Sequence, residues 1–169
     1  MPTLRPLRPE DAPALLAFER ENRAYFAAAV SDRGDEFFSR FDEMLRDRLA
    51  EQEAGICRFH VVVGTGGEVL GRVNLVDVAD GTASLGYRIA ERATGRGIAT
   101  RAVLDVCALA AGSYGLTALR AAAALDNVAS RTVLTRTGFT VTGRTRLPGR
   151  AALTYARDLT DLAPPHTAR

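Results

Sequence analysis

The stretch LGYRIAERATGRGIATRAV, residues 85–103, runs from a strand pattern through a basic loop into a helix pattern. The loop contains Gly95 and Gly97, which give the backbone conformational freedom and leave no Cβ atom in the way of a ligand. The first amides of the following helix lack partners inside the helix, and its dipole makes this end partly positive. These features predict a site for an anion such as a pyrophosphate, with Arg92 and Arg96 supplying further positive charge.

The loop does not match a dinucleotide-binding fingerprint. That fingerprint needs a third glycine, where Thr100 stands, and an acidic residue about 20 positions further on. Residues 106–125 contain no acidic residue, and the loop follows an antiparallel meander instead of the first strand of a βαβ unit. The pattern therefore disfavours a nucleotide-binding oxidoreductase, while an ordinary structural turn stays open as an alternative.

The rest of the chain predicts an α+β fold with a mixed sheet. Apolar runs bounded by turn residues predict strands, and apolar residues at helical spacing with caps and glycine stops predict helices. The predicted strands are 3–7, 56–64, 68–78, 82–90, 116–124, 139–147 and 151–159. The predicted helices are 11–22, with Asp11 as its cap, and 23–30, 35–53, 98–115 and 126–138. We expect a single domain over residues 1–160 and a flexible tail over residues 161–169.

Composition limits the class of protein. The chain has 169 residues, of which 47% are hydrophobic and 25% charged, as is typical of a globular protein. No apolar run approaches the ~18 residues of a membrane span, and the N-terminal segment lacks the apolar core of a signal peptide. We therefore expect a cytoplasmic protein without membrane contact, in which Cys57 and Cys107 are reduced core thiols.

All 22 basic residues are arginine. A chain without lysine cannot form a phosphate loop that ends in Gly-Lys-Ser/Thr, nor a Schiff base, so arginine or backbone amides must hold any anion. The net charge of +2 gives no case for nucleic-acid binding, which needs a concentrated basic face. No grouping of His, Cys and acidic residues predicts a metal site, and His60, which alternates within a strand, is expected to be structural.

Two motifs resemble those of the GNAT N-acetyltransferases. Motif A of that superfamily, Arg/Gln-x-x-Gly-x-Gly/Ala, is matched by Arg92, Gly95 and Gly97. The stretch LDNVASRTVLTRTGF, residues 125–139, resembles the Asn-x-x-Ser…Gly-Phe pattern of the branch that contains the ribosomal-protein alanine N-acetyltransferases. The N-terminal stretches LRPLRPEDAPAL and ENRAYF also resemble that branch, so the resemblance covers roughly residues 3–159.

The resemblance implies an α/β sandwich whose central, mostly antiparallel, twisted sheet splays between its fourth and fifth strands, residues 82–89 and 117–123. It also implies acetyl-CoA as co-substrate, with the pantetheine arm pairing with open strand-edge groups as another strand would. Gly86 is expected to mark a bulge that starts the splay, or else to make room for a neighbouring side chain.

The resemblance assigns the cofactor contacts to three places: the fourth strand, the motif A loop and the start of the helix after the fifth strand. The candidate contacts are Tyr87, Arg88, Ile89, Arg92, Thr94, Gly95, Arg96, Gly97, Ile98, Ala99, Thr100, Asn127, Ser130 and Arg131. The alternatives are that Asn127 is a plain helix cap and that Ser130 and Arg131 are ordinary helix residues.

The implied chemistry is direct attack of a neutral amine on the thioester in a ternary complex. Ser130 is the candidate general acid for the departing thiolate, with Tyr87 as the second candidate and Tyr155 as a third. The general base is unknown, because Ala83 and Ser84 stand where many relatives carry a glutamate. The possible replacements are Glu21, Asp77 and Asp80, with no preference among them.

The acceptor pocket is expected between the first helices and the turn of the last hairpin. The acidic residues of the first helices could attract an amine, or could simply solvate those helices; they are Glu19, Glu21, Asp32, Asp35 and Glu36. The expected acceptor is a primary amine, of a protein N-terminus or of a small molecule, and a homodimer is considered because relatives often pair. A non-catalytic acyl-CoA-binding domain is the alternative, since the expected carboxylates are missing.

Overall fold

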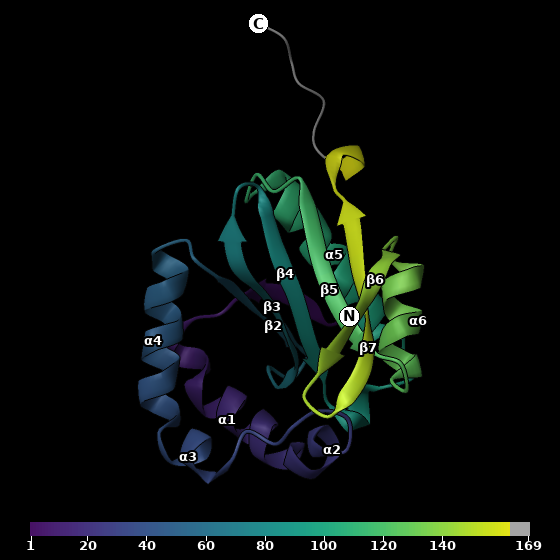
Figure 1. Cartoon of the computed structure of the whole chain (residues 1–169). Coiled ribbons are helices and arrows are strands. Elements are labelled where there is room, and N and C mark those ends of the chain that lie inside the picture. Colours follow the sequence, from purple (N-terminus) through teal and green to yellow (C-terminus); the bar gives the residue numbers. More distant parts are fainter. Residues whose placement is uncertain (163–169) are drawn as a thin grey trace, which may run out of the picture.

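The computed structural model describes residues 1–162. In it the strands form one sheet, and helices pack around that sheet (Figure 1). The strands are β1 (Thr3–Pro6), β2 (Arg58–Val63), β3 (Val69–Ala79), β4 (Thr82–Ile89), β5 (Ala118–Ala124), β6 (Thr140–Leu147) and β7 (Arg150–Asp158). The α-helices are α1 (Ala12–Glu21), α2 (Arg23–Ala27), α3 (Asp35–Ser39), α4 (Phe41–Glu53), α5 (Ile98–Gly112) and α6 (Val128–Arg136). Short 3₁₀ turns are η1 (Pro9–Asp11), η2 (Glu91–Ala93) and η3 (Thr160–Leu162). Of the predicted tail, Asp161 and Leu162 end η3, and the rest lies outside the described residues.

The described strands form a seven-stranded sheet in the order β1-β2-β3-β4-β5-β7-β6. All neighbours are antiparallel except β4 and β5, which are parallel. These two strands pair only where Thr82–Ser84 lie beside Ala118–Arg120. Beyond Ser84 they separate, so the backbone of β4 loses its partner on that side. The predicted α+β fold, with a mixed sheet that splays between the fourth and fifth strands, is confirmed.

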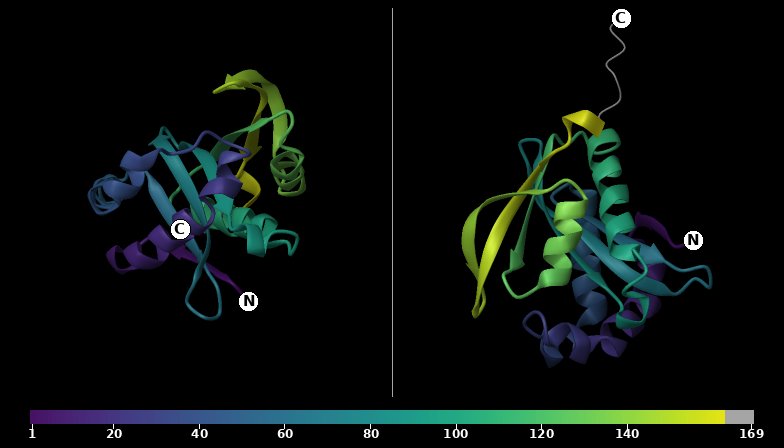
Figure 2. Two further views of the ribbon diagram at one scale, coloured as in Figure 1. Left: turned by 90° about the horizontal axis from the view of Figure 1, so that it is seen from below. Right: turned by 90° about the vertical axis from the view of Figure 1, so that its right-hand side faces the viewer.

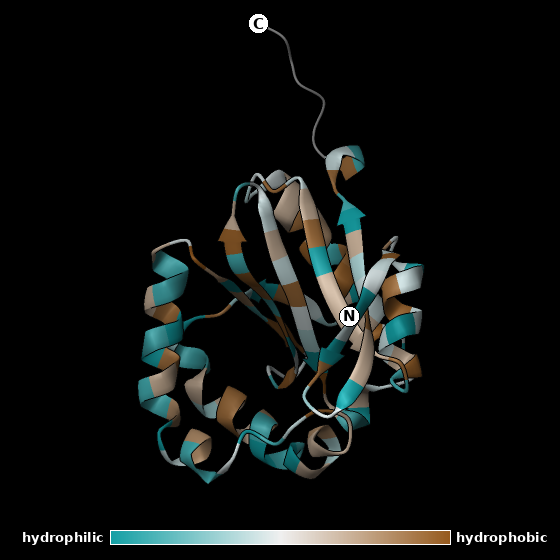
Figure 3. Cartoon of the chain, viewed as in Figure 1, coloured by the Kyte–Doolittle hydropathy of each residue, from teal (hydrophilic) through white to brown (hydrophobic). Residues whose placement is uncertain are grey.

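The two faces of the sheet carry different helices. Arg72 of β3 points to the face covered by α1, because its Nη1 donates to Oε1 of Glu19 at 2.7 Å. Val73 and its cross-strand neighbour His60 point to the other face, where the His60 Nε2 lies 2.6 Å from the hydroxyl of Tyr114, just after α5. Apolar bands run along the strands, whereas α4 is largely hydrophilic on its outer side (Figure 3).

The C-terminal hairpin of β6 and β7 bends away from the β1–β4 half of the sheet (Figure 2). β5 still pairs with β7 along the whole length of β5, from Ala118↔Asp158 to Ala124↔Ala152. The bend therefore keeps β5 with the hairpin while β4 stays with the other half. The gap between β4 and β5 therefore follows from the way in which the strands of the sheet pair.

Two details differ from the expectations. The predicted helix 35–53 is interrupted at Arg40, whose φ of −110° leaves the helical region, between the buried side chains of Phe37 and Phe41. Asp11 does not cap α1 with its side chain; its carboxylate instead accepts from both terminal nitrogens of Arg5 and from the Arg8 amide.

Both roles predicted for Gly86 are wrong: it neither marks a bulge nor makes room for a neighbouring side chain. β3 and β4 keep their register at Asn74↔Gly86, and the irregularity lies between Val76 and Ala79 instead. A Cβ atom built on Gly86 would meet nothing within 4 Å, so no neighbouring side chain occupies that space. Gly86 is exposed and faces open space beside the gap.

His60 is structural, as expected. It is 1% exposed, with Nδ1 3.1 Å from the carbonyl of Val73 and Nε2 close to the Tyr114 hydroxyl. Burial lowers the pKa of His60 to about 4, against an ordinary value of 6.5. The ring is therefore neutral in the folded protein at neutral pH, and protonation opposes folding.

This burial predicts a pH-dependent stability. Between pH 7 and pH 5 the unfolded chain gains a proton on His60 that the folded chain does not, so the free energy of unfolding falls by about 2 kcal/mol as the pH falls. Urea unfolding at pH 7, 6 and 5 measures the decrease, and His60→Gln is the control because glutamine does not titrate. An equal decrease in wild type and variant would show that other groups cause it.

Candidate active site

A cavity of about 440 Å³ passes through the gap between β4 and β5. Four consecutive residues of β4, from Leu85 to Arg88, line it, and so do four of β5, from Ala121 to Ala124. Its lining includes Arg72, on the face covered by α1, and Ser130 of α6, on the other face, so the cavity reaches both faces. It is open toward α6 on one face and toward the loop after α2 on the other.

Tyr87 and Ser130 meet on the α6 side of this cavity. Their hydroxyl oxygens are 3.0 Å apart, and the Tyr87 hydroxyl also lies 3.4 Å from the Ser130 carbonyl. Asn127 is the N-cap of α6, where its Oδ1 accepts from the Ser130 amide at 3.2 Å. Burial raises the pKa of Tyr87, so its hydroxyl keeps its proton at neutral pH. The three polar residues of two distant motifs thus form one hydrogen-bonded group.

The N-terminus of α5 presents free amides on the surface. Gly95 and Gly97 adopt left-handed φ values of 73° and 74°, and Gly97 is the N-cap of α5. Among the described residues, the amides of positions 95–100 donate to no carbonyl or side-chain oxygen. A Cβ atom at either glycine would meet nothing within 4 Å, so the space in front of these amides is open.

The remaining loop residues differ in how free they are. The Thr94 amide is not free, because it donates to the Glu91 carbonyl at 3.1 Å, and the Thr94 hydroxyl donates to the same oxygen. Ile98, Ala99 and Thr100 are half-buried in the first turn of α5. The side chains of Arg92 and Arg96 are exposed beside the loop, with Nη2 of Arg96 donating to the Arg92 carbonyl. A second cavity of about 400 Å³ borders the loop at residues 96–98.

Residues 3–140 match a family model described as Acetyltransferase (GNAT) domain. The chain belongs to this family. The match confirms the resemblance seen in the two sequence motifs, and family membership makes the chain an acetyl-CoA-dependent N-acetyltransferase.

Individual GNAT relatives agree with this assignment. The chain is 28% identical to "Probable N-acetyltransferase YjcK" of Bacillus subtilis over 80% of this chain and 78% of that protein. It superposes on the ribosomal-protein-S5-alanine acetyltransferase of Vibrio fischeri with a TM-score of 0.89, at 21% identity over 95% of this chain and 94% of that chain. It superposes on Mycobacterium smegmatis RimJ, solved with a CoA disulfide, with a TM-score of 0.84, at 25% identity over 94% of this chain and 82% of that chain. The branch named for ribosomal-protein alanine N-acetyltransferases is therefore confirmed as well.

Two expected cofactor contacts of this GNAT member point elsewhere. The Arg88 side chain lies on the α1 face, with its guanidinium 5.0 Å from the ring centre of Phe26 and 3.8 Å from the Glu19 carboxylate. The backbone carbonyl of Arg88 also faces Gly71 of β3, so it is the backbone of Tyr87 and Ile89 that lies on the unpaired edge of β4. Arg131 donates from Nη1 to the Leu125 carbonyl at 3.0 Å, so in this structure it fastens α6 to the end of β5.

None of the proposed replacement bases lines the cavity. Asp77 and Asp80 lie around the turn between β3 and β4, at the paired end of β4, and Glu21 is exposed at the end of α1. Tyr155 is 3% exposed in the core beside Ala121 and also lies outside the lining. The cavity lining contributed by residues 1–162 contains no carboxylate. The structure therefore supplies a candidate acid but no carboxylate base at the gap.

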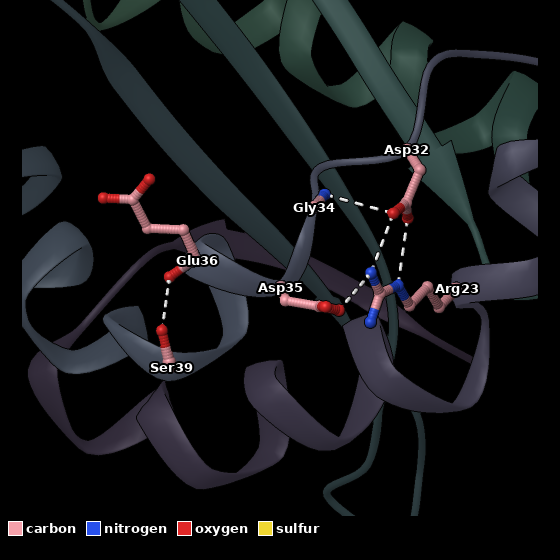
Figure 4. Close-up of polar contacts among 6 residues, drawn as sticks. All are labelled: Arg23, Asp32, Gly34, Asp35, Glu36 and Ser39. Atoms are coloured by element: carbon pink, nitrogen blue, oxygen red, sulfur yellow. Dashed lines mark hydrogen bonds and ion pairs between the residues drawn. The ribbon is translucent and has the colours of Figure 1, made fainter.

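Most of the acidic residues expected near the acceptor are held by arginine. Asp32 and Asp35 both accept from Arg23, and the second carboxylate oxygen of Asp32 also accepts from the Gly34 amide (Figure 4). Glu36 pairs with Arg40 at 3.0 Å. These ion pairs offset the negative charge that was expected to attract an amine. They also fasten the loop after α2, which borders the cavity, to the start of α3.

Five polar residues of the lining were missed in the sequence: Ser31, Arg33, Arg72, Asn74 and Arg150. The signal for two of them was present, because in GRVNL, residues 71–75, the polar positions alternate with Val73 and Leu75. Such alternation places Arg72 and Asn74 together on one face. Arg33 and Arg150 lie in a loop and at a hairpin turn, where the pattern gives no direction.

The described residues contain no group of three or more His, Cys, Asp and Glu side chains that could hold a metal ion. Cys57 and Cys107 are both buried and unpaired with each other, as expected. Within residues 1–162 no helix is both long and apolar enough to cross a membrane.

Proposed function

We propose that this protein transfers the acetyl group of acetyl-CoA to a primary amine, of a protein N-terminus or a small molecule, by direct attack in a ternary complex. The observation that carries the proposal is the cavity that joins the two faces of the sheet through the gap between β4 and β5. A thioester on the α5–α6 face and an amine on the α1–α2 face can meet there without displacing either helix layer. Positioning two reactants in this way can supply much of the rate.

The cofactor is assigned to the α5–α6 face. The free amides of positions 95–100 and the dipole of the 15-residue α5 suit a pyrophosphate. The unpaired edge of β4 at residues 87–89 suits the two amides of a pantetheine arm, as an added strand would. The RimJ relative was solved with a CoA disulfide, which supports CoA as the ligand without placing it on a face. Residues 1–160 would then act as one domain.

Tyr87 and Ser130 are proposed to deliver the proton that the departing thiolate needs. Tyr87 is protonated, half-buried and 3.0 Å from Ser130, so a proton can pass through the pair to a sulfur atom in the gap. The backbone amide of Ile89 is the proposed donor to the oxyanion of the tetrahedral intermediate. With no carboxylate in the described lining, water is the proposed first acceptor of the amine proton.

A panel of amines and peptides with detection of free CoA thiol tests this function. Acetyl-CoA should raise the melting temperature of the protein while NAD does not, and thiol should appear only when a suitable amine is present. Stabilisation by acetyl-CoA without thiol release across the whole panel would contradict the transferase and favour the non-catalytic acyl-CoA-binding domain. No stabilisation at all would remove both readings.

A further inference from the structure

We infer that the acceptor side of the cavity binds a carboxylate, so that the preferred acceptor is an amine that carries a carboxylate a few bonds from its reacting nitrogen. The inference rests on the proposed function for the reacting amine. The carboxylate site itself is argued from the side chains alone. Four arginines line the cavity, Arg33, Arg72, Arg88 and Arg150, and the described lining contains no acidic residue.

The positive charges beside the cavity are gathered on one face of the sheet. Arg72 and Arg88 are direct cross-strand neighbours of β3 and β4, and their side chains therefore share the α1 face. Like charges directly opposite each other destabilise a sheet. A third guanidinium, that of Arg33, comes from the loop after α2 to the same place. Such a group is favourable only where negative charge lies among its members.

The protein supplies too little negative charge to neutralise these three arginines. Glu19 is 1% exposed and is shared by all three: its carboxylate lies 2.7 Å from Arg72, 3.5 Å from Arg33 and 3.8 Å from Arg88. One carboxylate accepts well from one arginine fork, and only the Arg72 contact is a hydrogen bond. The cluster therefore keeps an excess of positive charge beside the cavity.

The hydrogen-bonding capacity of these arginines is not fully used. The buried Nε atoms of Arg33 and Arg72 have no hydrogen-bond acceptor among the described residues. Burial, and then repulsion from Arg72, lower the pKa of Arg33 to about 10, and burial also lowers the pKa of Arg88. Both remain charged at neutral pH. A carboxylate in the cavity would offset the mutual repulsion of these guanidinium groups.

The acidic residues around the cavity already have arginine partners. Asp32 and Asp35 are held by Arg23, outside the lining (Figure 4). Asp126 lies 3.5 Å from Arg150 at the other rim. A polyamine would therefore meet guanidinium groups in the cavity, whereas an amino acid or an acidic peptide N-terminus would meet a complementary charge.

Matched pairs of probes test the inference. L-Alanine is compared with L-alaninamide, and the peptide Ala-Asp-Ala-amide with Ala-Asn-Ala-amide; spermidine is the cationic reference. Binding is measured by calorimetry with and without saturating CoA. We expect the carboxylate probe of at least one pair to bind about tenfold or more tightly than its amide, with spermidine weakest. The small-molecule pair and the peptide pair distinguish a metabolite acceptor from a protein N-terminus.

The variants Arg33→Gln and Arg150→Gln should reduce that preference to within about threefold, because each removes a fork from the cavity without leaving Glu19 unpaired. Arg40→Gln is the matched control, since Arg40 is exposed in an ion pair away from the cavity, and it should keep the wild-type preference. Arg33 lies in a loop and Arg150 is the first residue of β7, so circular dichroism should show wild-type folding.

Equal binding within both pairs, or absence of binding by both carboxylate probes, would overturn the inference. So would a preference that Arg33→Gln and Arg150→Gln both leave intact. Thiol release is measured separately on the same probes. A carboxylate preference without thiol release would contradict the proposed transfer reaction and leave the carboxylate site standing.

Discussion

Gly97→Glu is expected to weaken acetyl-CoA binding by at least about a hundredfold, which corresponds to roughly 2.7 kcal/mol. Gly97 is the N-cap of α5, and a side chain there enters the open space in front of the free amides. Glutamate would place bulk and a negative charge where the diphosphate is proposed to lie. The carboxylate would also be drawn to the helix N-terminus and compete for the same amides.

Gly115→Glu is the matched control for this variant. Gly115 follows the other end of α5, has a left-handed φ of 65°, and likewise has nothing within 4 Å of an added Cβ atom. Both substitutions therefore carry a similar backbone strain, of about 1–2 kcal/mol for a non-glycine residue at such a φ. Titration calorimetry with acetyl-CoA should show normal affinity for Gly115→Glu. Unchanged affinity in Gly97→Glu would remove the proposed cofactor site.

Tyr87→Phe is expected to lower kcat by about a hundredfold or more while the dissociation constant of acetyl-CoA stays nearly unchanged. The phenyl ring keeps the packing of Tyr87, and the substitution removes only the hydroxyl that lies 3.0 Å from Ser130. Ser130→Ala should also lower turnover more than affinity. Steady-state kinetics together with calorimetry separate the two effects.

The double variant decides whether the two hydroxyls act as one group. If the proton passes from Tyr87 through Ser130, removing both should cost little more than removing one, because members of one catalytic unit are strongly non-additive. If the losses of kcat in the two single variants multiply in the double variant, the two residues act independently. A large loss of acetyl-CoA affinity with normal kcat would mean that the pair only holds the cofactor.

Much of the fold could be predicted because its signals are local. Glycine at positions 95 and 97, followed by a helical apolar pattern, predicts a loop with left-handed residues before α5, and the structure shows both. Alternation along β3 and the turn at residues 79–81 predict the meander that ends at the splay. The break at Arg40 was not predictable, since residues 35–53 carry a continuous helical pattern without a glycine or proline.

The sequence by itself determined the family, the order of the elements and the loop before α5, because backbone propensity and motif spacing act over a few neighbouring residues. Only the tertiary structure brought Tyr87 to Ser130 across 43 positions, and gathered Arg33, Arg72 and Arg88 around Glu19. Proximity of this kind depends on strand register and on which helix covers which face. Those choices are fixed by burial of the whole core, and no short stretch of sequence encodes them.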